Sequence, residues 1–214
     1  KEHQRTFCGR STRVGRWSTE YARPTPCQGR LTMMSISEEL KQRIKKTRLV
    51  IFDVDGVLTD GRLYFGDNGQ EYKAFYSKDG LGMKLLMQSG IEVAIITARS
   101  SPVVAHRMEN LGIRHFYQGQ ADKIPAFKQI AEKLQLSHEQ VAYVGDDLID
   151  LPVMTQVGLS IAVADAHPEV IKRAHWTTPG KGGLGGARDV CDLIMHIQGT
   201  LQPTIDAHLS TLTN

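Results

Sequence analysis

Two aspartates, Asp53 and Asp55, directly follow the apolar segment 49–52. On extended backbone, side chains two residues apart point the same way, and neighbouring carboxylates repel one another unless a cation lies between them. One carboxylate can attack phosphorus, while another protonates the leaving alkoxide and later deprotonates water. We therefore predict Asp53 as nucleophile and Asp55 as general acid and base. A solvated acidic turn is the alternative, but an apolar segment rarely runs straight into two unpaired carboxylates.

Polar residues also follow other apolar segments. Thr97 ends segment 91–97, Lys123 lies early in a predicted helix, and a second acidic group follows segment 141–145, namely Asp146, Asp147 and Asp150. Taken singly, Thr97 is more typical of a helix cap or turn, and Lys123 of a solvated surface. Taken together, these groups form a site for a cation and an anion, which favours Mg²⁺ and phosphate.

Other catalytic classes lack their motifs. The eight histidines show no zinc-binding spacing, and the chain has no Walker loop, no G-x-G-x-x-G after a strand and no G-x-S-x-G. P-loop nucleotide hydrolysis, hydride transfer and serine hydrolysis are therefore disfavoured.

Apolar and amphipathic segments alternate along the chain, which predicts a doubly wound parallel α/β sheet. Because ligands bind beyond the carboxyl ends of such strands, the polar residues above would meet there. A capping-box spacing from Ser35 to Glu38 predicts a first helix reaching about Lys46. The other expected elements are strands 49–54, 91–97, 115–118, 141–145 and 159–163, and helices 80–89, 102–111, 121–136, 151–156, 168–173 and 187–198.

Residues 63–75 break this alternation. The Asp67-Asn68-Gly69 turn between aromatic segments predicts a projecting β-hairpin. The interval from Asp53 to Thr97 has room for only this hairpin and one helix, and that from Thr97 to Lys123 for one helix and a strand, so we expect no cap domain. Exposed aromatic residues on the hairpin would favour aggregation of a monomer, which predicts oligomerisation; they are Tyr64, Phe65, Tyr72 and Phe75.

Composition limits the remaining possibilities. The net charge is +3 over 214 residues, yet residues 1–33 hold seven basic and two acidic residues, so the remainder is slightly acidic and offers no basic stripe for nucleic acid. We predict that residues 1–33 are a disordered leader, that the natural start is Met33 or Met34, that 34–200 is one domain and that 201–214 is a tail. Three cysteines without C-x-x-C spacing favour a reducing, cytoplasmic setting, and no membrane span is expected.

These motifs, in order, resemble the four motifs of the haloacid dehalogenase (HAD) superfamily of phosphatases. From about Arg48 to Gly199, the chain resembles more narrowly the family that hydrolyses 3-deoxy-D-manno-octulosonate 8-phosphate (KDO 8-phosphate) in lipopolysaccharide core synthesis. That resemblance implies a Rossmann-like fold. The closer similarity lies in residues 53–61, 73–75, 79–82, 117–120, 142–150, 162–168 and 188–192.

The resemblance also implies residue roles. Mg²⁺ would lie on the side chains of Asp53 and Asp146 and the backbone carbonyl of Asp55, and Thr97 and Lys123 would hold phosphoryl oxygens. Asp147 and Asp150 would orient Lys123 and the water on the ion. Substrate contacts would come from Asp55, Lys123, Tyr76, Ser77, Lys78, Asp79, Gly80, Lys84, Arg99 and Arg107.

Lys78 and Lys84 stand where the family usually has arginine, and lysine cannot hold a carboxylate in a bidentate fashion. The family's tetramers imply a homotetramer in which the hairpins form a central barrel and residues 182–188 help to cover the pocket. On its own, the glycine-rich stretch 180–186 is equally consistent with a flexible linker.

Three alternatives remain open at this stage. The substrate could be another sugar phosphate or a sialic acid phosphate, because the fold and catalytic motifs do not specify the sugar. The chain could be a non-catalytic HAD-like assembly module, although Asp53, Asp55, Lys123 and Asp146 are all present. Nucleic-acid binding through the basic leader is the third.

Overall fold

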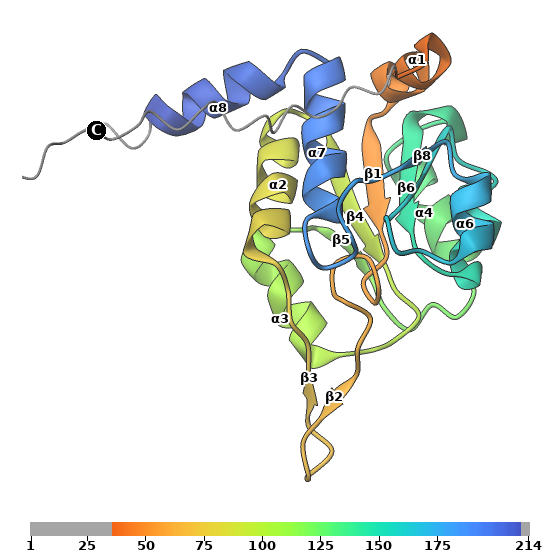
Figure 1. Cartoon of the computed structure of the whole chain (residues 1–214), viewed down its shortest axis with the longest axis vertical. Helices are drawn as coiled ribbons and strands as arrows, with labels where there is room; N and C mark the ends of the chain where they lie inside the picture. The colour runs from red at the N-terminus through yellow and green to blue at the C-terminus, as the bar shows by residue number, and fades with distance from the viewer. Residues whose placement is uncertain (1–35, 211–214) are drawn as a thin grey trace, which may run out of the picture. The chain divides into compact units, whose positions relative to one another are not determined.

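The structure is a computed structural model that describes residues 36–210 (Figure 1). The predicted leader, the proposed starts at Met33 and Met34, and Ser35 of the predicted capping box lie outside these residues. No helix within the described part of the chain is long and apolar enough to cross a membrane.

A six-stranded parallel sheet forms the centre of the described chain, with strand order β5-β4-β1-β6-β7-β8. Its central strands are continuous runs of apolar residues because helices cover both faces of the sheet. The strands are β1 Leu49–Phe52, β4 Glu92–Ile96, β5 His115–Tyr117, β6 Val141–Gly145, β7 Leu159–Ala162 and β8 Trp176–Thr177. The predicted doubly wound sheet is confirmed.

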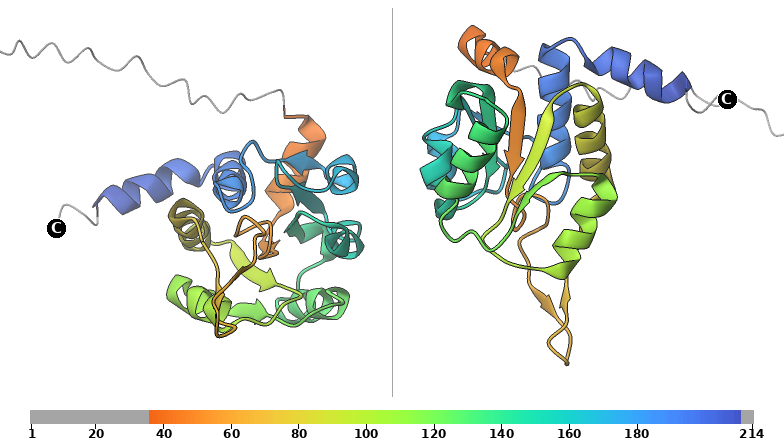
Figure 2. Two further views of the ribbon diagram at one scale, coloured as in Figure 1. Left: turned by 60° about the horizontal axis from the view of Figure 1, so that its bottom comes forward. Right: turned by 180° about the vertical axis from the view of Figure 1, so that it is seen from behind.

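Helices α2, α3 and α7 lie on one face of this sheet, and α4 and α6 on the other (Figure 2). Helices α2 and α7 pack closely against each other, and this pair brings the C-terminal part of the chain beside the segment that follows the hairpin. The helices are α1 Glu38–Lys46, α2 Ser77–Gln88, α3 Pro102–Leu111, α4 Ile124–Lys133, α5 Leu151–Met154, α6 Pro168–Arg173, α7 Gly186–Ile197 and α8 Leu201–Ser210.

Several predicted boundaries were wrong for local reasons. Helix α1 is capped by Ser37, whose hydroxyl accepts from the Leu40 amide at 3.1 Å, so the cap lies two residues after the predicted one. Helix α4 is shorter than predicted and is followed by Gln135 with φ 55°, a left-handed conformation that cannot continue a helix. A 3₁₀ turn, Leu148–Asp150, precedes α5.

Two elements were not predicted at all. Strand β8 has only two residues, too few to show a periodicity. Helix α8 replaces the first ten residues of the expected polar tail; it buries no residue and projects from the domain in Figure 1, so it has no apolar face to reveal it.

Strands β2 Tyr64–Phe65 and β3 Glu71–Tyr72 form the predicted hairpin, which projects from the carboxyl-end edge of the sheet (Figure 1). Its turn is closed by the Gly66 amide, which donates to the Gln70 carbonyl at 2.8 Å. In the described chain, only this hairpin and α2 lie between β1 and β4, and only α3 and β5 between β4 and α4, so the expectation of no cap domain is confirmed.

The direction of strand order changes between β1 and β6, which are adjacent in the sheet and pair in register from Leu49 with Val141 to Phe52 with Val144. Asp53 and Asp146, the residues that directly follow the two strands, therefore emerge close together. A crevice at such a switch point is where doubly wound folds bind ligands.

Candidate active site

A cleft of about 310 Å³ opens beyond the carboxyl ends of β1, β4 and β6. The loops after all three strands line this cleft, so residues nearly a hundred positions apart in sequence lie close together there. The lining residues are Asp53, Asp55, Gly61, Leu63, Thr97, Ala98, Arg99, Asp146, Asp147 and Ile149.

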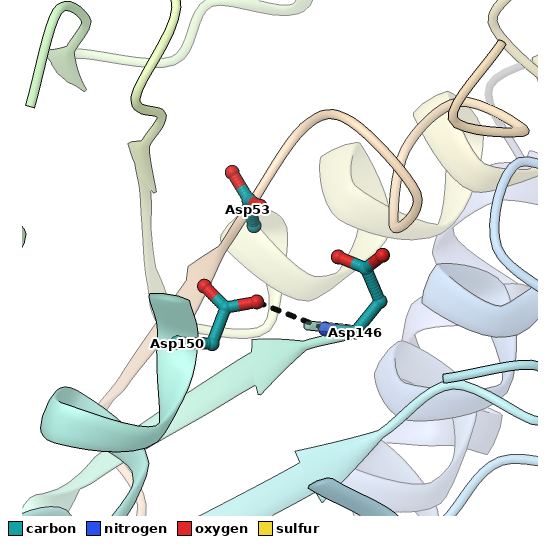
Figure 3. Close-up of side chains that lie close together, drawn as sticks. All are labelled: Asp53, Asp146 and Asp150. Carbon is teal, nitrogen blue, oxygen red and sulfur yellow. Dashed lines mark hydrogen bonds between the residues drawn. The ribbon is translucent and has the colours of Figure 1, made fainter. Parts of the chain in front are cut away.

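Three aspartates gather at the floor of this region. One carboxylate oxygen from each of Asp53, Asp146 and Asp150 lies within 4.8 Å of the other two (Figure 3). Asp53 comes from the end of β1, Asp146 from the end of β6, and Asp150 from the 3₁₀ turn that follows. This group differs from the predicted repulsive pair, because the Asp55 side chain lies elsewhere, against Lys73.

The three carboxylates have different hydrogen-bonding roles. Asp150 is fully buried, and each of its oxygens accepts two bonds: Oδ1 from Lys123 and Tyr143, each at 2.7 Å, and Oδ2 from the amides of Asp146 and Asp147 at 3.0 and 3.2 Å. Asp146 Oδ1 is buried with no hydrogen-bond partner among the described residues, and the nearest partner of the buried Asp53 Oδ1 is the ammonium of Lys123, 3.0 Å away. Asp150 is therefore a supporting group, whereas Asp53 and Asp146 accept fewer bonds and keep acceptor capacity for a ligand.

The carboxylate oxygens of Asp53 and Asp146 are suitable ligands for a divalent cation. Hard cations prefer carboxylate and carbonyl oxygens, and a buried carboxylate without a partner is unfavourable. Gly56 leaves room for Asp146, since a Cβ at this position would lie 2.0 Å from Asp146 Oδ2. The donor set contains neither histidine nor cysteine, which argues against zinc.

Burial raises the pKa values of Asp53 and Asp146. Desolvation, followed by repulsion from Asp150, raises the pKa of Asp53 to about 7. The same two causes, joined by Asp53, raise the pKa of Asp146 to about 8. A cation between them would favour the charged forms, so the site combines negative charge with a need for a positive partner.

Lys123 supplies one positive charge. Its side chain is 1% exposed, and its Nζ lies 3.0 Å from Asp53 Oδ1 and 2.7 Å from Asp150 Oδ1. The Tyr143 hydroxyl accepts from the same ammonium at 3.1 Å and donates to Asp150. The attraction of Asp53 and Asp150 outweighs desolvation, so the pKa of Lys123 is raised and the group stays charged.

Thr97 and Asp147 line the cleft, as predicted for site residues. The Thr97 amide donates to the Tyr117 carbonyl at 2.9 Å, which holds the end of β4 against β5. Asp147 is exposed and its Oδ1 accepts from the Leu148 amide at 2.7 Å, so it caps the 3₁₀ turn that carries Asp150.

Asp55 sits in a separate group of charges at the base of the hairpin. Its Oδ1 pairs with Lys73 Nζ, and its Oδ2 lies 4.0 Å from Arg99 Nε. Glu71 Oε1 lies 3.4 Å from Lys73 Nζ and 3.0 Å from an Arg99 nitrogen. The hairpin therefore reaches the residue predicted as general acid.

Five of the predicted substrate residues lie in three places. Arg99 lines the cleft. Tyr76, Ser77 and Lys78 lie at the beginning of α2, where the Lys78 Nζ is 5.7 Å from the centre of the Tyr76 ring. Arg107, on α3, lies beside Gly80 and 5.8 Å from the centre of the Phe75 ring.

Gly80 has a steric role in this chain. A Cβ on Gly80 would lie 2.3 Å from a guanidinium nitrogen of Arg107, so only glycine leaves room for that side chain. Asp79 is 2% exposed, and its Oδ1 accepts from the Arg188 amide at 2.9 Å. The Asp79 carboxylate thus caps the amino end of α7, and its predicted substrate contact stays a prediction.

Lys84 is not brought to the cleft of its own chain. It lines another pocket, of about 440 Å³, together with Glu92 and Arg114. Glu92 begins β4, so this pocket lies at the amino edge of the sheet, opposite the aspartates. Within one chain, Lys84 lies away from the aspartate cleft, and its predicted substrate contact stays a prediction.

The glycine-rich segment 180–186 is packed against the loop that carries the aspartates, so the linker interpretation is wrong. The Gly183 amide donates to the Val57 carbonyl at 2.9 Å, and the Gly182 amide to Asp165 Oδ1 at 2.9 Å. Within one chain, the segment packs against residues 53–59.

Known proteins share this architecture. The model of the haloacid dehalogenase-like hydrolases matches residues 113–183. The KDO 8-phosphate phosphatase KdsC of Yersinia pestis is 52% identical over 167 residues, which cover 78% of this chain and 89% of that protein. The chain belongs to the KDO 8-phosphate phosphatase family. The crystal structure of the Y. pestis phosphatase aligns with a TM-score of 0.76 over 77% of this chain and 89% of that chain.

Two further family structures hold ligands. The phosphatase of Moraxella catarrhalis, in complex with magnesium, phosphate and KDO, is 41% identical with a TM-score of 0.76, covering 81% of this chain and 98% of that chain. The cobalt-bound phosphatase of Haemophilus influenzae is 40% identical with a TM-score of 0.73, covering 75% of this chain and 94% of that chain. This chain is thus a phosphoric monoester hydrolase by family.

Sequence reasoning assigned no role to Lys73, Glu71 or Tyr143. A signal for Tyr143 exists, because a hydroxyl inside the apolar strand 141–145 must find a buried partner. Lys73 and Glu71 are two residues apart on one hairpin strand, but nothing local indicates that this face meets Asp55.

Proposed function

We propose that this chain hydrolyses KDO 8-phosphate to KDO and inorganic phosphate, for lipopolysaccharide core synthesis, as a Mg²⁺-dependent enzyme with an aspartyl-phosphate intermediate. The observation that carries the proposal is the pair of buried carboxylates at one cleft: Asp146, with an unpartnered oxygen, and Asp53, which contacts the buried ammonium of Lys123. The similarity to KdsC phosphatases over most of the chain supports the choice of substrate.

In the first step, a carboxylate oxygen of Asp53 attacks phosphorus and the bond from phosphorus to the sugar oxygen breaks. Asp55 donates its proton to that oxygen as it leaves, so KDO departs as an alcohol. Lys123, 3.0 Å from Asp53, and Thr97 offer donors to the phosphoryl oxygens. Asp150 and Tyr143 keep the Lys123 ammonium in place.

In the second step, water attacks the phosphorus of phospho-Asp53. Asp55, now a carboxylate, takes a proton from this water, and Asp53 leaves as a carboxylate with release of phosphate. The enzyme thereby returns to its starting protonation state. Asp55 lines the cleft and is part-exposed, so both the leaving oxygen and water can reach it.

The side chains of Asp53 and Asp146 and the carbonyl of Asp55 would hold Mg²⁺. Once bound, the ion would neutralise charge on the phosphoryl group and on the two acids. The M. catarrhalis structure contains magnesium and the H. influenzae structure cobalt, so the identity of the working ion is itself testable.

Phosphate release from KDO 8-phosphate tests the activity. We expect turnover with Mg²⁺, loss of turnover with chelator and its return when Mg²⁺ is restored, with Co²⁺ measured alongside. Asp53→Asn, nearly equal in volume, should lower kcat by more than about 10⁴-fold because it removes the nucleophile. Turnover by Asp53→Asn at the wild-type rate would reject the mechanism.

A panel of phosphorylated sugars and sugar acids, including a sialic acid phosphate, tests substrate choice. We expect the highest kcat/KM for KDO 8-phosphate. A higher value for another sugar acid would leave the chemistry intact and change the substrate. Absence of metal-dependent phosphate release from every member would favour the non-catalytic module.

A homotetramer remains part of this proposal. Three hairpin aromatics are exposed, Tyr64 by 42%, Phe65 by 62% and Tyr72 by 56%, and a capless cleft needs another surface to exclude water. A second copy packed on the hairpin would meet both needs. We also place the enzyme in the cytoplasm, an assignment supported by the buried free thiol of Cys191 and testable by cell fractionation.

A further inference from the structure

We propose that Lys73 is a positioning residue for the general acid: it holds one carboxylate oxygen of Asp55, so that the other faces the leaving group. The inference rests on the proposed function, because it assumes that Asp55 donates the proton. Lys73 lies at the base of the hairpin and is assigned no role by the reaction itself.

The contacts form a closed ring of alternating charge. Lys73 Nζ pairs with Asp55 Oδ1 and lies 3.4 Å from Glu71 Oε1. Arg99 contacts the same Glu71 oxygen at 3.0 Å and lies 4.0 Å from Asp55 Oδ2. Two carboxylates and two cations thus restrain each other, with residues 71 and 73 on the hairpin, Arg99 after β4 and Asp55 after β1.

Burial separates the roles of the two cations. The Lys73 side chain is 1% exposed, whereas that of Arg99 is 43% exposed and lines the cleft. Substrate can therefore meet Arg99 but not Lys73 in this chain. A buried ammonium needs partners, and the partners of Lys73 are Asp55 and Glu71.

The geometry assigns the two oxygens of Asp55 different tasks. Oδ1 is engaged by Lys73, which leaves Oδ2 on the cleft side, near Arg99. In the first step, the proton on Oδ2 moves to the sugar oxygen as its bond to phosphorus breaks. Without Lys73, the Asp55 carboxyl could rotate, and its proton would face the sugar oxygen in a smaller fraction of enzyme–substrate complexes.

This role predicts a loss that depends on the leaving group. A sugar alkoxide leaves poorly unless it is protonated, while p-nitrophenolate leaves without a proton. We expect Lys73→Met to lower kcat for KDO 8-phosphate by about 100-fold but kcat for p-nitrophenyl phosphate by no more than about threefold. Turnover of p-nitrophenyl phosphate at saturating Mg²⁺ also reports that the variant is folded.

Controls separate positioning from general damage. Lys128→Met, an exposed lysine on α4, should change neither rate, and Lys73→Arg should restore most of the selectivity because it keeps a buried cation. If Lys73→Met does not fold, Lys73→Gln keeps a donor between the carboxylates, and we expect the same selective loss, of at least about tenfold.

Equal losses on both substrates, or an increase in KM with unchanged kcat, would overturn the proposal, because the first indicates structural damage and the second a substrate contact. These outcomes differ from failure of the proposed function, which would appear as absence of Mg²⁺-dependent turnover of KDO 8-phosphate by the wild-type chain.

Discussion

Asp53, Asp146 and Asp150 share one site but differ in what surrounds each carboxylate. Asp150 accepts four hydrogen bonds, and its charge is thereby satisfied. Asp146 keeps a buried oxygen without a partner, Asp53 has only Lys123 beside its buried oxygen, and burial raises the pKa of the two acids to about 8 and about 7. The two acids proposed to hold Mg²⁺ through their side chains are thus acids whose charged forms burial disfavours.

This asymmetry predicts an unusual dependence of stability on pH. Both pKa values lie above the ordinary value of 3.8, so between about pH 4 and pH 8 the metal-free folded state binds more protons than the unfolded state. These groups therefore stabilise the fold at low pH and lose that contribution as pH rises through 7 to 8.

In thermal unfolding with chelator, these two carboxyl groups should make Tm lower at pH 8.5 than at pH 5.5. Mg²⁺ should raise Tm more at pH 8.5 than at pH 5.5, because protons then no longer compete with the ion for the carboxylates. Asp146→Asn should flatten the difference, which separates it from titration elsewhere. An unchanged pH dependence in Asp146→Asn would contradict the assignment.

Tyr143 supports the site without facing the cleft. Tyr143→Phe removes only the hydroxyl that bridges Lys123 and Asp150 in a fully buried position. We expect the free energy of unfolding to fall by about 1 kcal/mol and kcat by roughly tenfold, because Lys123 loses one of its restraints. Urea unfolding and phosphate release measure the two effects.

Tyr72→Phe, on the exposed hairpin, is the matched control for that experiment and should change kcat by less than about twofold. A Tyr143→Phe variant with wild-type kcat would limit this tyrosine to a structural role.

At the scale of elements, the loop 53–59 and the glycine-rich segment 180–186 act as one unit. A Cβ at Gly182 would lie 1.6 Å from the Gly56 carbonyl oxygen, and one at Gly183 would lie 2.4 Å from the Thr59 carbonyl carbon. Only residues without side chains allow the two backbones to approach this closely. The segment thereby fixes the loop that carries Asp53 and Asp55.

Two glycines allow this contact to be isolated. Gly183 and Gly199 both have positive φ, 63° and 74°, but a Cβ on Gly199 would meet nothing within 4 Å. We expect Gly199→Ala to cost about 1 kcal/mol from backbone strain alone, and Gly183→Ala about 3 kcal/mol with loss of activity. Chemical unfolding and phosphate release compare them, and equal costs would rule out the packing argument.

At the scale of the whole molecule, the exposed hairpin is the feature that a single chain explains least. It reaches Asp55 through its base, while its tip presents aromatic side chains to solvent. The proposed tetramer would bury that tip and would make the general acid sensitive to assembly through Lys73 and Glu71.

Phe65→Glu tests the assembly. A charge on the most exposed hairpin aromatic should prevent the copies from packing there, so we expect a lower mass by light scattering and reduced kcat. Phe65→Tyr should retain both. A wild-type chain that is monomeric and fully active would remove the proposed tetramer.

The sequence by itself determined the alternation of strands and helices, the hairpin, the absence of a cap and the acids at strand ends. These features depend on local periodicity, turn chemistry and spacing, which are read along the chain. Asp53, Asp146, Thr97 and Lys123 could be nominated because polar residues follow several strands whose carboxyl ends meet at one edge, although Thr97 and Lys123 taken singly would not have indicated a site.

Only the tertiary structure decided which acids share a site and which contacts serve packing. The pairing of β1 with β6 places Asp53 beside Asp146 and Asp150, while the fold of the hairpin moves Asp55 towards Lys73. Asp79 caps α7, and Lys84 lies at the opposite edge of the sheet. Such outcomes depend on contacts between residues far apart in sequence, and no local pattern encodes them.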